Sequence, residues 1–402
     1  MKRVLIFSLN YYPRFIGGAE VALKEITDRV TDIEFHMVTL RFDSALPDVE
    51  KVGNVLVHRI GFTKHHPSIA DLRRFPLHFN KHYFQLAAAF KALSLHRIYR
   101  YDGIWVMMAH SCGIPAGLFK FFNDRVPYLL TLQEGDPPEQ IERMMHPVFP
   151  LFRHAFTSAT YLQAISTFLL AWGRHMGFGG EGIVIPNAVD TGLFGNAASS
   201  DFEKQRLGKK PDDVFLVTTS RLVHKNAVDT VIEALALLPE NVHFAVYGIG
   251  PDENALKALA EHLGVTSRVH FMGEIAHADI PPALAACDIF IRPSRSEGMG
   301  NSFVEAMAAG LPVIATQEGG IADFLFDAKR NPGKETTGWA VDADAPEQVA
   351  EAVKDILATP EQVRTVTETA RQMAVEKYDW SLIAANMQDL FRRMLALHLG
   401  KR

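Results

Sequence analysis

The chain has only two cysteines among its 402 residues, Cys112 and Cys287, and they lie far apart. This scarcity excludes the disulfide framework of a small secreted domain, so we expect two unpaired thiols in a reducing compartment. No run of about 20 apolar residues is present, which excludes a membrane-spanning helix. The start, Met1-Lys2-Arg3, is basic like a signal peptide, but the apolar stretch after it is too short. We therefore expect a buried strand there and a cytoplasmic protein.

A strong excess of either charge is also missing. The formal net charge is −5, from 41 basic and 46 acidic residues, and no repeat or low-complexity tract stands out. This balance argues against a dedicated nucleic-acid-binding protein. No cluster of histidine and cysteine has the spacing of metal ligands. Asp342-Ala343-Asp344 has an Asp-x-Asp form, but Asp344 is better interpreted as part of the cap of a helix that begins at Pro346.

What is present is a regular alternation of short apolar runs with helical patterns, which predicts parallel sheets wrapped by helices. A chain of about 400 residues is too long to fold around a single hydrophobic core. We therefore predict an α/β protein with two doubly wound domains. The predicted domains are 1–191 and 192–380, with a linker rich in Gly, Ser and charge over 192–211. In such folds ligands bind at the carboxyl ends of the strands, here in a cleft between the domains. The predicted strands are 4–9, 34–40, 55–60, 103–108, 128–132, 161–165 and 182–185, then 214–220, 242–247, 269–272, 289–292 and 312–316.

One region departs from the overall charge balance. Residues 58–100 contain eight Lys or Arg residues against one acid, Asp71, and five aromatic residues lie among them between residues 75 and 90. One interpretation is a surface that contacts an anionic membrane and brings the protein to a lipid-linked substrate. The other is a basic helix whose aromatic face packs inside the first domain. The aromatic residues are Phe75, Phe79, Tyr83, Phe84 and Phe90.

The most informative stretch runs from Ser294 to Ile314 and follows a predicted strand that ends at a proline. It places Glu297 before a glycine-rich turn and Glu305 inside the helix that follows. A strand, a glycine turn and a helix aim backbone N–H groups and a positive helix end at an anion. Carboxylates at this spacing can accept hydrogen bonds from sugar and ribose hydroxyls. The pattern indicates a sugar-nucleotide site.

This stretch, Glu-x7-Glu followed by Ala-Met-Ala-x-Gly-x-Pro-Val-Ile, resembles the donor-site signature of retaining GT-B glycosyltransferases, in particular glycosyltransferase family 4 (glycosyl transferases group 1). The resemblance extends to about Trp380 and implies a GT-B fold with two Rossmann-like domains. It also implies that 381–402 form a helix that crosses back to the first domain. Further matching segments, in the expected order, are Gly17–Glu20, Ile185–Asp190, Ser220–Lys225, Tyr247–Pro251 and Arg268–Gly273.

The resemblance implies a role for each matching residue of the donor site. Arg221 and Lys225 grip the diphosphate, while Glu305 binds the ribose and Glu297 the transferred sugar. Gly17 and Gly18 let the backbone approach a phosphate or the acceptor, although their spacing is not that of a dinucleotide fingerprint. Backbone groups complete the donor site, at Gly248, Gly250, Glu274, Ile275, Gly298, Met299, Gly300 and Asn301. Gly319-Gly320 is a further phosphate-side loop.

The acceptor side is less clearly marked. His110, after the strand 103–108, aligns by context with a histidine that the family uses near the reacting centre. Glu134 and Asp136 lie where many relatives carry His-Gly or His-Asp, and they either orient an acceptor hydroxyl or cap the helix from Pro138 onward. Asn187 is a third candidate for acceptor contact.

The resemblance implies a retaining transfer of sugar from a UDP- or GDP-sugar to a hydroxyl of a glycan or lipid-linked acceptor. It also implies same-face displacement, with no carboxylate nucleophile, no metal and no cofactor. His110, Arg221, Lys225 and Glu297 are the catalytic candidates. The alternatives are a sugar-nucleotide epimerase or hydrolase on the same scaffold, and a non-catalytic nucleotide-sugar-binding protein.

Overall fold

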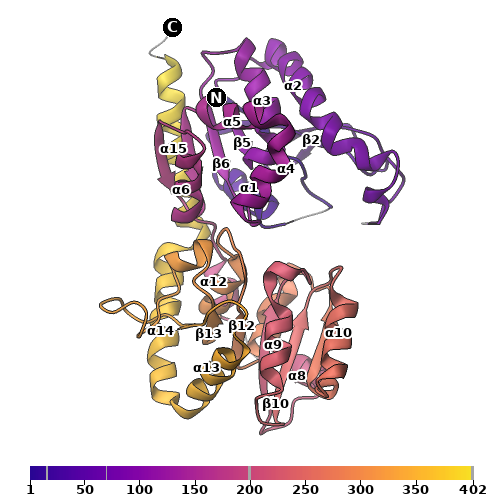
Figure 1. Cartoon of the computed structure of the whole chain (residues 1–402). Helices are drawn as coiled ribbons and strands as arrows, with labels where there is room; N and C mark the ends of the chain where they lie inside the picture. Colours follow the sequence, from indigo (N-terminus) through magenta and orange to yellow (C-terminus); the bar gives the residue numbers. More distant parts are fainter. Residues whose placement is uncertain (15–16, 69, 198–200, 400–402) are drawn as a thin grey trace. The chain divides into compact units, whose positions relative to one another are not determined.

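The computed structural model describes residues 1–402 except 15–16, 69, 198–200 and 400–402. The chain divides into two compact units, Met1–Asn187 with Trp380–Arg402, and Ala188–Asp379 (Figure 1). Each has its own sheet and is described separately. Within the described residues no helix is long and apolar enough to cross a membrane. Cys112 and Cys287 are both buried and free, as the sequence predicted.

The first unit is built on a sheet with the strand order β3-β4-β2-β1-β5-β6-β7-β8, parallel except for the β3–β4 pair. Apolar runs form the central strands because both of their faces are buried. The strands are β1 (Lys2–Phe7), β2 (Ile33–Leu40), β3 (Val49–Val52), β4 (Val55–Ile60), β5 (Gly103–Met107), β6 (Tyr128–Leu132), β7 (Tyr161–Ala164) and β8 (Glu181–Val184). The α-helices are α1 (Gly18–Arg29), α2 (Asn80–Tyr99), α3 (Ala109–Phe122), α4 (Pro138–Met145), α5 (Phe149–Thr157), α6 (Thr167–His175) and α15 (Trp380–Leu399).

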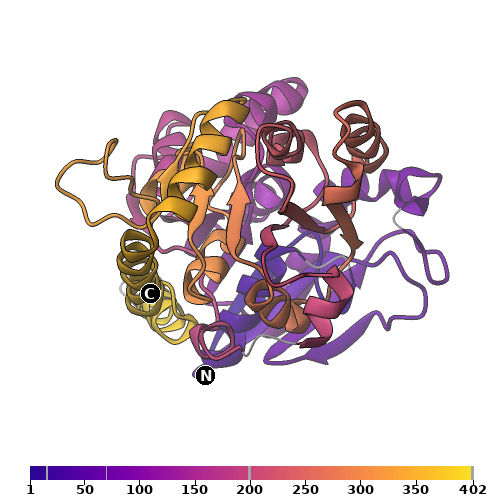
Figure 2. The same ribbon diagram turned by 90° about the horizontal axis from the view of Figure 1, so that it is seen from below.

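The second unit has a fully parallel sheet with the order β11-β10-β9-β12-β13-β14. Figure 2 shows helices flanking this sheet and an orange loop, after the 3₁₀ helix η7 (Gly319–Asp323), that extends away from the unit. The strands are β9 (Val214–Thr219), β10 (Val242–Tyr247), β11 (Val269–Gly273), β12 (Ile289–Arg292), β13 (Val313–Ala315) and β14 (Trp339–Ala340). The α-helices are α7 (Thr191–Gly195), α8 (Asp201–Leu207), α9 (Val228–Leu235), α10 (Glu253–His262), α11 (Ile280–Ala285), α12 (Asn301–Ala308), α13 (Pro346–Ala358) and α14 (Pro360–Lys377).

The predicted strands are all present, with ends displaced by at most two residues. Strand β3 was not predicted, because it is a short edge strand whose side chains are only partly buried and lack an apolar pattern. Residues 192–211 were predicted to be a linker. The described part of that segment instead holds α7 and α8 within the second unit, and 198–200 lie outside the described residues. The polar composition reflects short, exposed helices.

The last helix, α15, packs on the first unit, where it contacts α1 and β5. Phe391 fits between two aromatic side chains of the sheet, with ring centroids 5.6 Å from Phe35 and 4.9 Å from Trp105. Arg392 pairs with Asp32 and Arg393 with Glu181 at the margins. Burial of Phe391 contributes more to this contact than either ion pair, because exposed ion pairs are worth at most about 1 kcal/mol each.

Two histidines of neighbouring strands are buried beside each other in the first unit. His36 on β2 contacts the Tyr101 hydroxyl at 2.9 Å, whereas neither ring nitrogen of His58 on β4 has a hydrogen-bond partner. Burial lowers the pKa of His36, and burial with the nearby His36 and Lys91 lowers the pKa of His58 to about 4. Both imidazoles are therefore neutral in the folded protein at pH 7.

Acidification is expected to destabilise the protein through His58. Because the folded pKa lies below the unfolded value, the unfolded chain binds more protons, so stability falls as the pH drops from about 6.5 towards 4. The shift corresponds to about 3 kcal/mol at the acid end. Urea unfolding at pH 7 and pH 5 should show a smaller acid loss for His58→Phe than for the wild type. The exposed His262 provides the control, since His262→Gln should leave the acid loss unchanged.

Candidate active site

The loops that carry the predicted donor residues meet at one edge of the second sheet, the carboxyl ends of its parallel strands. Strands β9, β10 and β11 follow each other outward on one side, and β12 then pairs with β9 on the other side. The connections leave in opposite directions at this point, which opens the crevice where such sheets bind ligands. Arg221 and Lys225 follow β9, and Glu297 follows β12. The switch point therefore lies between the two loops expected to hold the donor.

Glu297 is held by a buried arginine that the sequence analysis did not consider. Arg292, the last residue of β12, donates from Nη2 to Glu297 Oε1 at 2.9 Å and from Nη1 to the Ser302 hydroxyl at 2.8 Å. Its guanidinium also lies over the Phe303 ring, 4.2 Å from the centroid. Burial lowers the pKa of Arg292, and the charge of Glu297 opposes that effect. Arg292 thus fixes one carboxylate oxygen of Glu297.

Glu305 is also buried and has a partner, as a carboxylate among apolar neighbours requires. His277 Nε2 lies 3.2 Å from Glu305 Oε1. His277 begins the 3₁₀ helix η6 (His277–Asp279), which follows the segment containing Glu274 and Ile275. The structure therefore connects the segment predicted to hold the base with the carboxylate predicted to hold the ribose. No sequence signal for His277 was available, because its role depends on a contact 28 residues away.

The loop with Arg221 and Lys225 is fixed through its backbone. Asn226 donates from its side chain to the Arg221 carbonyl at 2.7 Å, and the Arg295 N–H donates to the Lys225 carbonyl at 2.8 Å. Ala227, at φ +52°, occupies the left-handed region, which is costly for a residue with a Cβ atom. Arg221 is exposed and Lys225 half-buried. The loop thus presents two cations on a backbone held in place by its neighbours.

Glycines are required where these loops pack together. A Cβ on Gly248 would overlap the Ser220 carbonyl, and one on Gly250 would overlap the Leu222 carbonyl. A Cβ on Gly319 would likewise overlap the Glu297 carbonyl. The Gly320 N–H donates to that carbonyl at 3.0 Å. These glycines bring the loops after β10 and β13 against those carrying Arg221 and Glu297.

The glycine turn after Glu297 leads directly into α12. Gly300 has φ +87° and leaves no room for a Cβ beside Phe303 and Arg292, and Asn301 begins the helix. Gly298 and Met299 are buried. At the neighbouring strand ends, hydroxyls are buried without a hydrogen-bond partner among the described residues. They belong to Thr218, Thr219, Ser220 and Ser294. Buried polar groups are normally paired, so this edge is suited to a polar ligand or ordered water.

The first unit places His110 at the corresponding edge of its own sheet. The switch point there lies between β1 and β5, since β2 and β5 flank β1. His110 is in the first turn of α3 rather than on the strand, which ends at Met107. Its Nδ1 lies 3.4 Å from Glu134 Oε1, and its Nε2 lies 2.9 Å from the Ser111 hydroxyl. Met108, just before α3, has the unusual φ of +61°.

The structure gives Glu134 a different place from the one predicted. Its side chain is fully buried, and Oε1 accepts the Ala109 N–H at 2.7 Å at the start of α3. A carboxylate in this position orients His110 and stabilises the N-terminus of α3, rather than that of the helix from Pro138 onward, while its Oε2 has no hydrogen-bond partner among the described residues. Asp136, two residues on, is exposed in the loop before α4.

Asn187 is also buried, in a reciprocal amide pair. Gln133 Nε2 donates to Asn187 Oδ1 at 3.0 Å, and Asn187 Nδ2 donates back to Gln133 Oε1 at 3.3 Å. The pair joins the loop after β6 to the segment after β8. This contact gives Asn187 a structural role that does not depend on contact with an acceptor.

Gly17 and Gly18 are exposed at the start of α1. The Gly17 N–H donates to the side chain of Glu20 at 2.7 Å in a capping box, and burial raises the pKa of Glu20. The Gly17 amide therefore already has an acceptor. Residues 15–16, immediately before it, lie outside the described residues.

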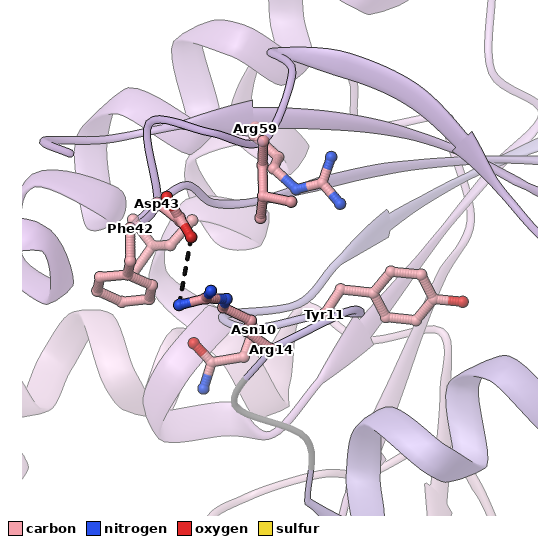
Figure 3. A pocket seen from close by; sticks show the side chains of 8 residues that line it. Asn10, Tyr11, Arg14, Phe42, Asp43 and Arg59 are labelled. Carbon is pink, nitrogen blue, oxygen red and sulfur yellow. Dashed lines mark ion pairs between the residues drawn. The ribbon is translucent and has the colours of Figure 1, made fainter. Parts of the chain in front are cut away.

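A small pocket lies at the carboxyl ends of β1 and β2 in the first unit (Figure 3). It encloses about 280 Å³, counting the open space at its mouth, and is lined by Asn10, Tyr11, Arg14, Leu40, Phe42, Asp43, Leu46 and Arg59. Figure 3 shows Arg14 pointing at the buried Asp43, 3.3 Å away. Burial alone would raise the pKa of Asp43, but hydrogen bonds from Ala45 and His66 and the charge of Arg14 lower it to about 2. The charges of Arg14 and Asp43 in the pocket thus neutralise each other.

The Asp-x-Asp carboxylates are engaged in ion pairs. Asp342 pairs with Arg330 at 2.7 Å and Asp344 with Arg295 at 2.6 Å. Asp344 does not cap α13, whose N-cap residue is Ala345. Across the described chain no three His, Cys, Asp or Glu side chains form a group suited to a metal ion.

Comparison with known proteins identifies the second unit most directly. The sequence model described as "Glycosyl transferases group 1" matches residues 199–373. A GDP-mannose-dependent α-(1-6)-phosphatidylinositol monomannoside mannosyltransferase of Mycobacterium tuberculosis is 33% identical over 221 residues, 52% of this chain. The match spans 55% of that relative, so the chain covers about half the length of the curated relatives it matches.

Solved structures match the whole fold. Sucrose-phosphate synthase from Thermosynechococcus elongatus superposes with a TM-score of 0.80 at 20% identity, covering 98% of this chain and 100% of that one. Anabaena HepE in complex with UDP and glucose superposes with a TM-score of 0.75 at 21% identity, covering 98% and 100%. Identities this low establish the fold alone, which is the GT-B fold.

Proposed function

We propose that this chain, a group 1 glycosyltransferase with the GT-B fold, moves a sugar from a UDP- or GDP-sugar to a hydroxyl of a glycan or glycolipid. The observation that carries the proposal is the set of charged groups at one switch point of the second unit. Two buried carboxylates, Glu297 and Glu305, each have one oxygen engaged by a neighbouring residue, and Arg221 and Lys225 lie on the adjacent strand loop.

These residues suit the two parts of a nucleotide sugar. Glu305 would accept hydrogen bonds from the ribose hydroxyls, close to the backbone of Glu274 and Ile275 that would meet the base. Glu297, fixed by Arg292, would accept hydrogen bonds from hydroxyls of the sugar. Charge-assisted hydrogen bonds of this kind are about twice as strong as neutral ones.

The reaction builds negative charge on the leaving diphosphate while the anomeric carbon becomes oxocarbenium-like. Arg221, Lys225 and the N-terminus of α12 provide fixed positive charge for that diphosphate, so we propose a transfer without metal or cofactor. We also propose retention by same-face displacement, in which the leaving phosphate helps to deprotonate the acceptor. Neither Glu297 nor Glu305 acts as a nucleophile in this scheme, since each is assigned to a hydroxyl.

The first unit would contribute His110 and the acceptor. His110 is oriented by the buried Glu134, so its imidazole has a defined direction near the reacting sugar. The Mycobacterium relative is named for a lipid acceptor. We extend the proposal to a cytoplasmic protein that meets a lipid-linked acceptor by peripheral contact with an anionic membrane through residues 58–100.

Calorimetric titration with UDP, GDP and ADP, without added metal, tests the donor site. One nucleotide should bind, and Glu305→Ala should weaken it about 10- to 100-fold, because hydrogen bonds to a charged group contribute about 1.5–3 kcal/mol each. Glu351→Ala, on the exposed surface of α13, is the matched control and should leave affinity unchanged. If the folded protein bound none of the three, the donor assignment would fail.

A further inference from the structure

Helix α2 is apolar on two opposite faces. One face packs on the first unit through Phe84, Ala88, Ala92 and Leu95, all buried. The opposite side carries Phe79, Tyr83, Leu86 and Phe90 at spacings of four, three and four residues, which places them in one stripe along the helix. We call these four residues the outer stripe.

The outer stripe is exposed. Leu86 is 59% and Phe90 69% accessible, and Phe75, just before the helix, is 80% accessible. Of the five aromatic residues in this region only Phe84 is buried. The interpretation of a packed aromatic face is therefore wrong, because the buried face of α2 is built mainly from small and aliphatic side chains. Large apolar side chains that are exposed next to one another on a protein surface often mark a binding site.

The neighbouring helix α3 also carries exposed aromatic side chains. Helices α2 and α3 pack together, and the rings of His96 and Phe119 near their ends lie 5.4 Å apart. Directly after Phe119, Phe121 and Phe122 are 77% and 66% accessible. Exposed rings therefore occur along α2 and at the end of α3.

The segment that carries the stripe contains basic residues and no acidic ones. Residues 72–100 contain six lysines and arginines and no acid, and the nearest acid, Asp71, pairs with Lys64 at 2.6 Å. Within the described chain none of the six forms a salt bridge. They are Arg73, Arg74, Lys81, Lys91, Arg97 and Arg100. Cations without carboxylate partners remain available for an external anion.

We propose that the outer stripe docks on an anionic lipid surface, together with Phe75, the adjacent Arg73 and Arg74, and Arg97 farther along the same face of the helix. Aromatic and aliphatic side chains enter the boundary between headgroups and acyl chains, and cations beside them pair with lipid phosphates. A second copy of the chain is the weaker candidate, because a two-fold interface through this face would bring like charges together.

The placement of α2 relative to the acceptor side supports this choice and rests on the function proposed above. Gln85 Nε2 donates to the Ser111 carbonyl at 3.1 Å, so the first half of α2 is attached to the turn that carries His110. A lipid surface on the outer stripe would thus bring a lipid-linked hydroxyl to the edge of the sheet where His110 lies.

Sedimentation with vesicles tests the proposal without any substrate. The full chain should bind vesicles of equimolar phosphatidylcholine and phosphatidylglycerol, bind phosphatidylcholine alone weakly, and dissociate at high salt. Two double variants, Phe79→Ser with Phe90→Ser and Arg73→Glu with Arg97→Glu, should each weaken binding at least about tenfold. Matched controls on the second unit are Phe202→Ser, at a ring 70% exposed, and Arg364→Glu. Both should bind as the wild type does.

Nucleotide binding, measured on the same variants, separates this proposal from the proposed function. All four altered positions of the double variants are exposed, so folding and nucleotide affinity should be unchanged. Equal binding to both vesicle compositions, no binding to either, or equal loss in the controls would overturn the docking proposal. So would self-association of the wild type that is lost in the Phe79 and Phe90 variant without any vesicle binding.

Discussion

Replacing Glu297 with glutamine is expected to lower kcat by about a hundredfold or more, with UDP or GDP affinity changed less than about twofold. Glutamine has the same size and can still accept the hydrogen bond from Arg292, but it lacks the charge that strengthens hydrogen bonds from the sugar hydroxyls. The loss should appear in turnover because those hydrogen bonds gain most as the sugar develops positive charge. Steady-state kinetics with the donor that calorimetry identifies would measure it.

The controls for Glu297 follow from its contact with Arg292. Glu351→Gln, on the exposed surface of α13, should leave kcat unchanged. Glu297→Ala should be less stable than Glu297→Gln by about 1–3 kcal/mol, because only the alanine variant leaves the buried Arg292 N–H without its acceptor at this position. An equal loss of free-nucleotide affinity in Glu297→Gln and Glu305→Ala would contradict the division of roles between sugar and ribose.

Replacing Lys225 with methionine is expected to lower kcat/KM for the donor by about a hundredfold to a thousandfold. Methionine keeps the apolar stem but removes the ammonium group that would neutralise the leaving diphosphate. The loop should stay in place because its backbone is held by Arg295 and Asn226. Lys257→Met, on the exposed surface of α10, is the control and should have no effect.

Because we propose a transfer without metal, the Lys225 prediction can also be tested with a chelator and with added Mg²⁺. With fixed cations as the source of positive charge, a chelator should change wild-type turnover by less than about twofold, and added Mg²⁺ should not rescue Lys225→Met. Loss of activity on chelation would show that a metal neutralises the diphosphate and would contradict the assignment of that role to Arg221 and Lys225.

The fold could be predicted in outline because parallel strands bury both faces and therefore appear as short apolar runs. Edge elements were the exception. Strand β3 is partly exposed and has no such run, and the polar 192–211 segment looked like a linker although its described part includes two short helices. Local composition does not distinguish an exposed helix from a loop when neither is packed on an apolar face.

The carboxylates Glu297 and Glu305 were predicted because a glycine turn followed by a helix has a local signature. Their partners were not predicted. Arg292 precedes a proline at a strand end and looks like a boundary residue, and His277 is one of seventeen histidines. Each acquires its role only when the fold brings it within 3.2 Å of a carboxylate. Glu134 shows the reverse case, since a residue that looked available in the sequence is buried.

The sequence by itself determined which strands form and which loops carry glycines, carboxylates and cations, since these depend on short-range hydrophobic patterns and turn chemistry. Only the tertiary structure decided how the loops combine. The strand order places the loops after β9 and β12 side by side, and burial converts Arg292 and Glu297 into a fixed pair. The same holds for α2, where packing buries one apolar face and leaves the other exposed. Which face is covered depends on contacts between segments distant in the sequence, and periodicity alone contains no information about them.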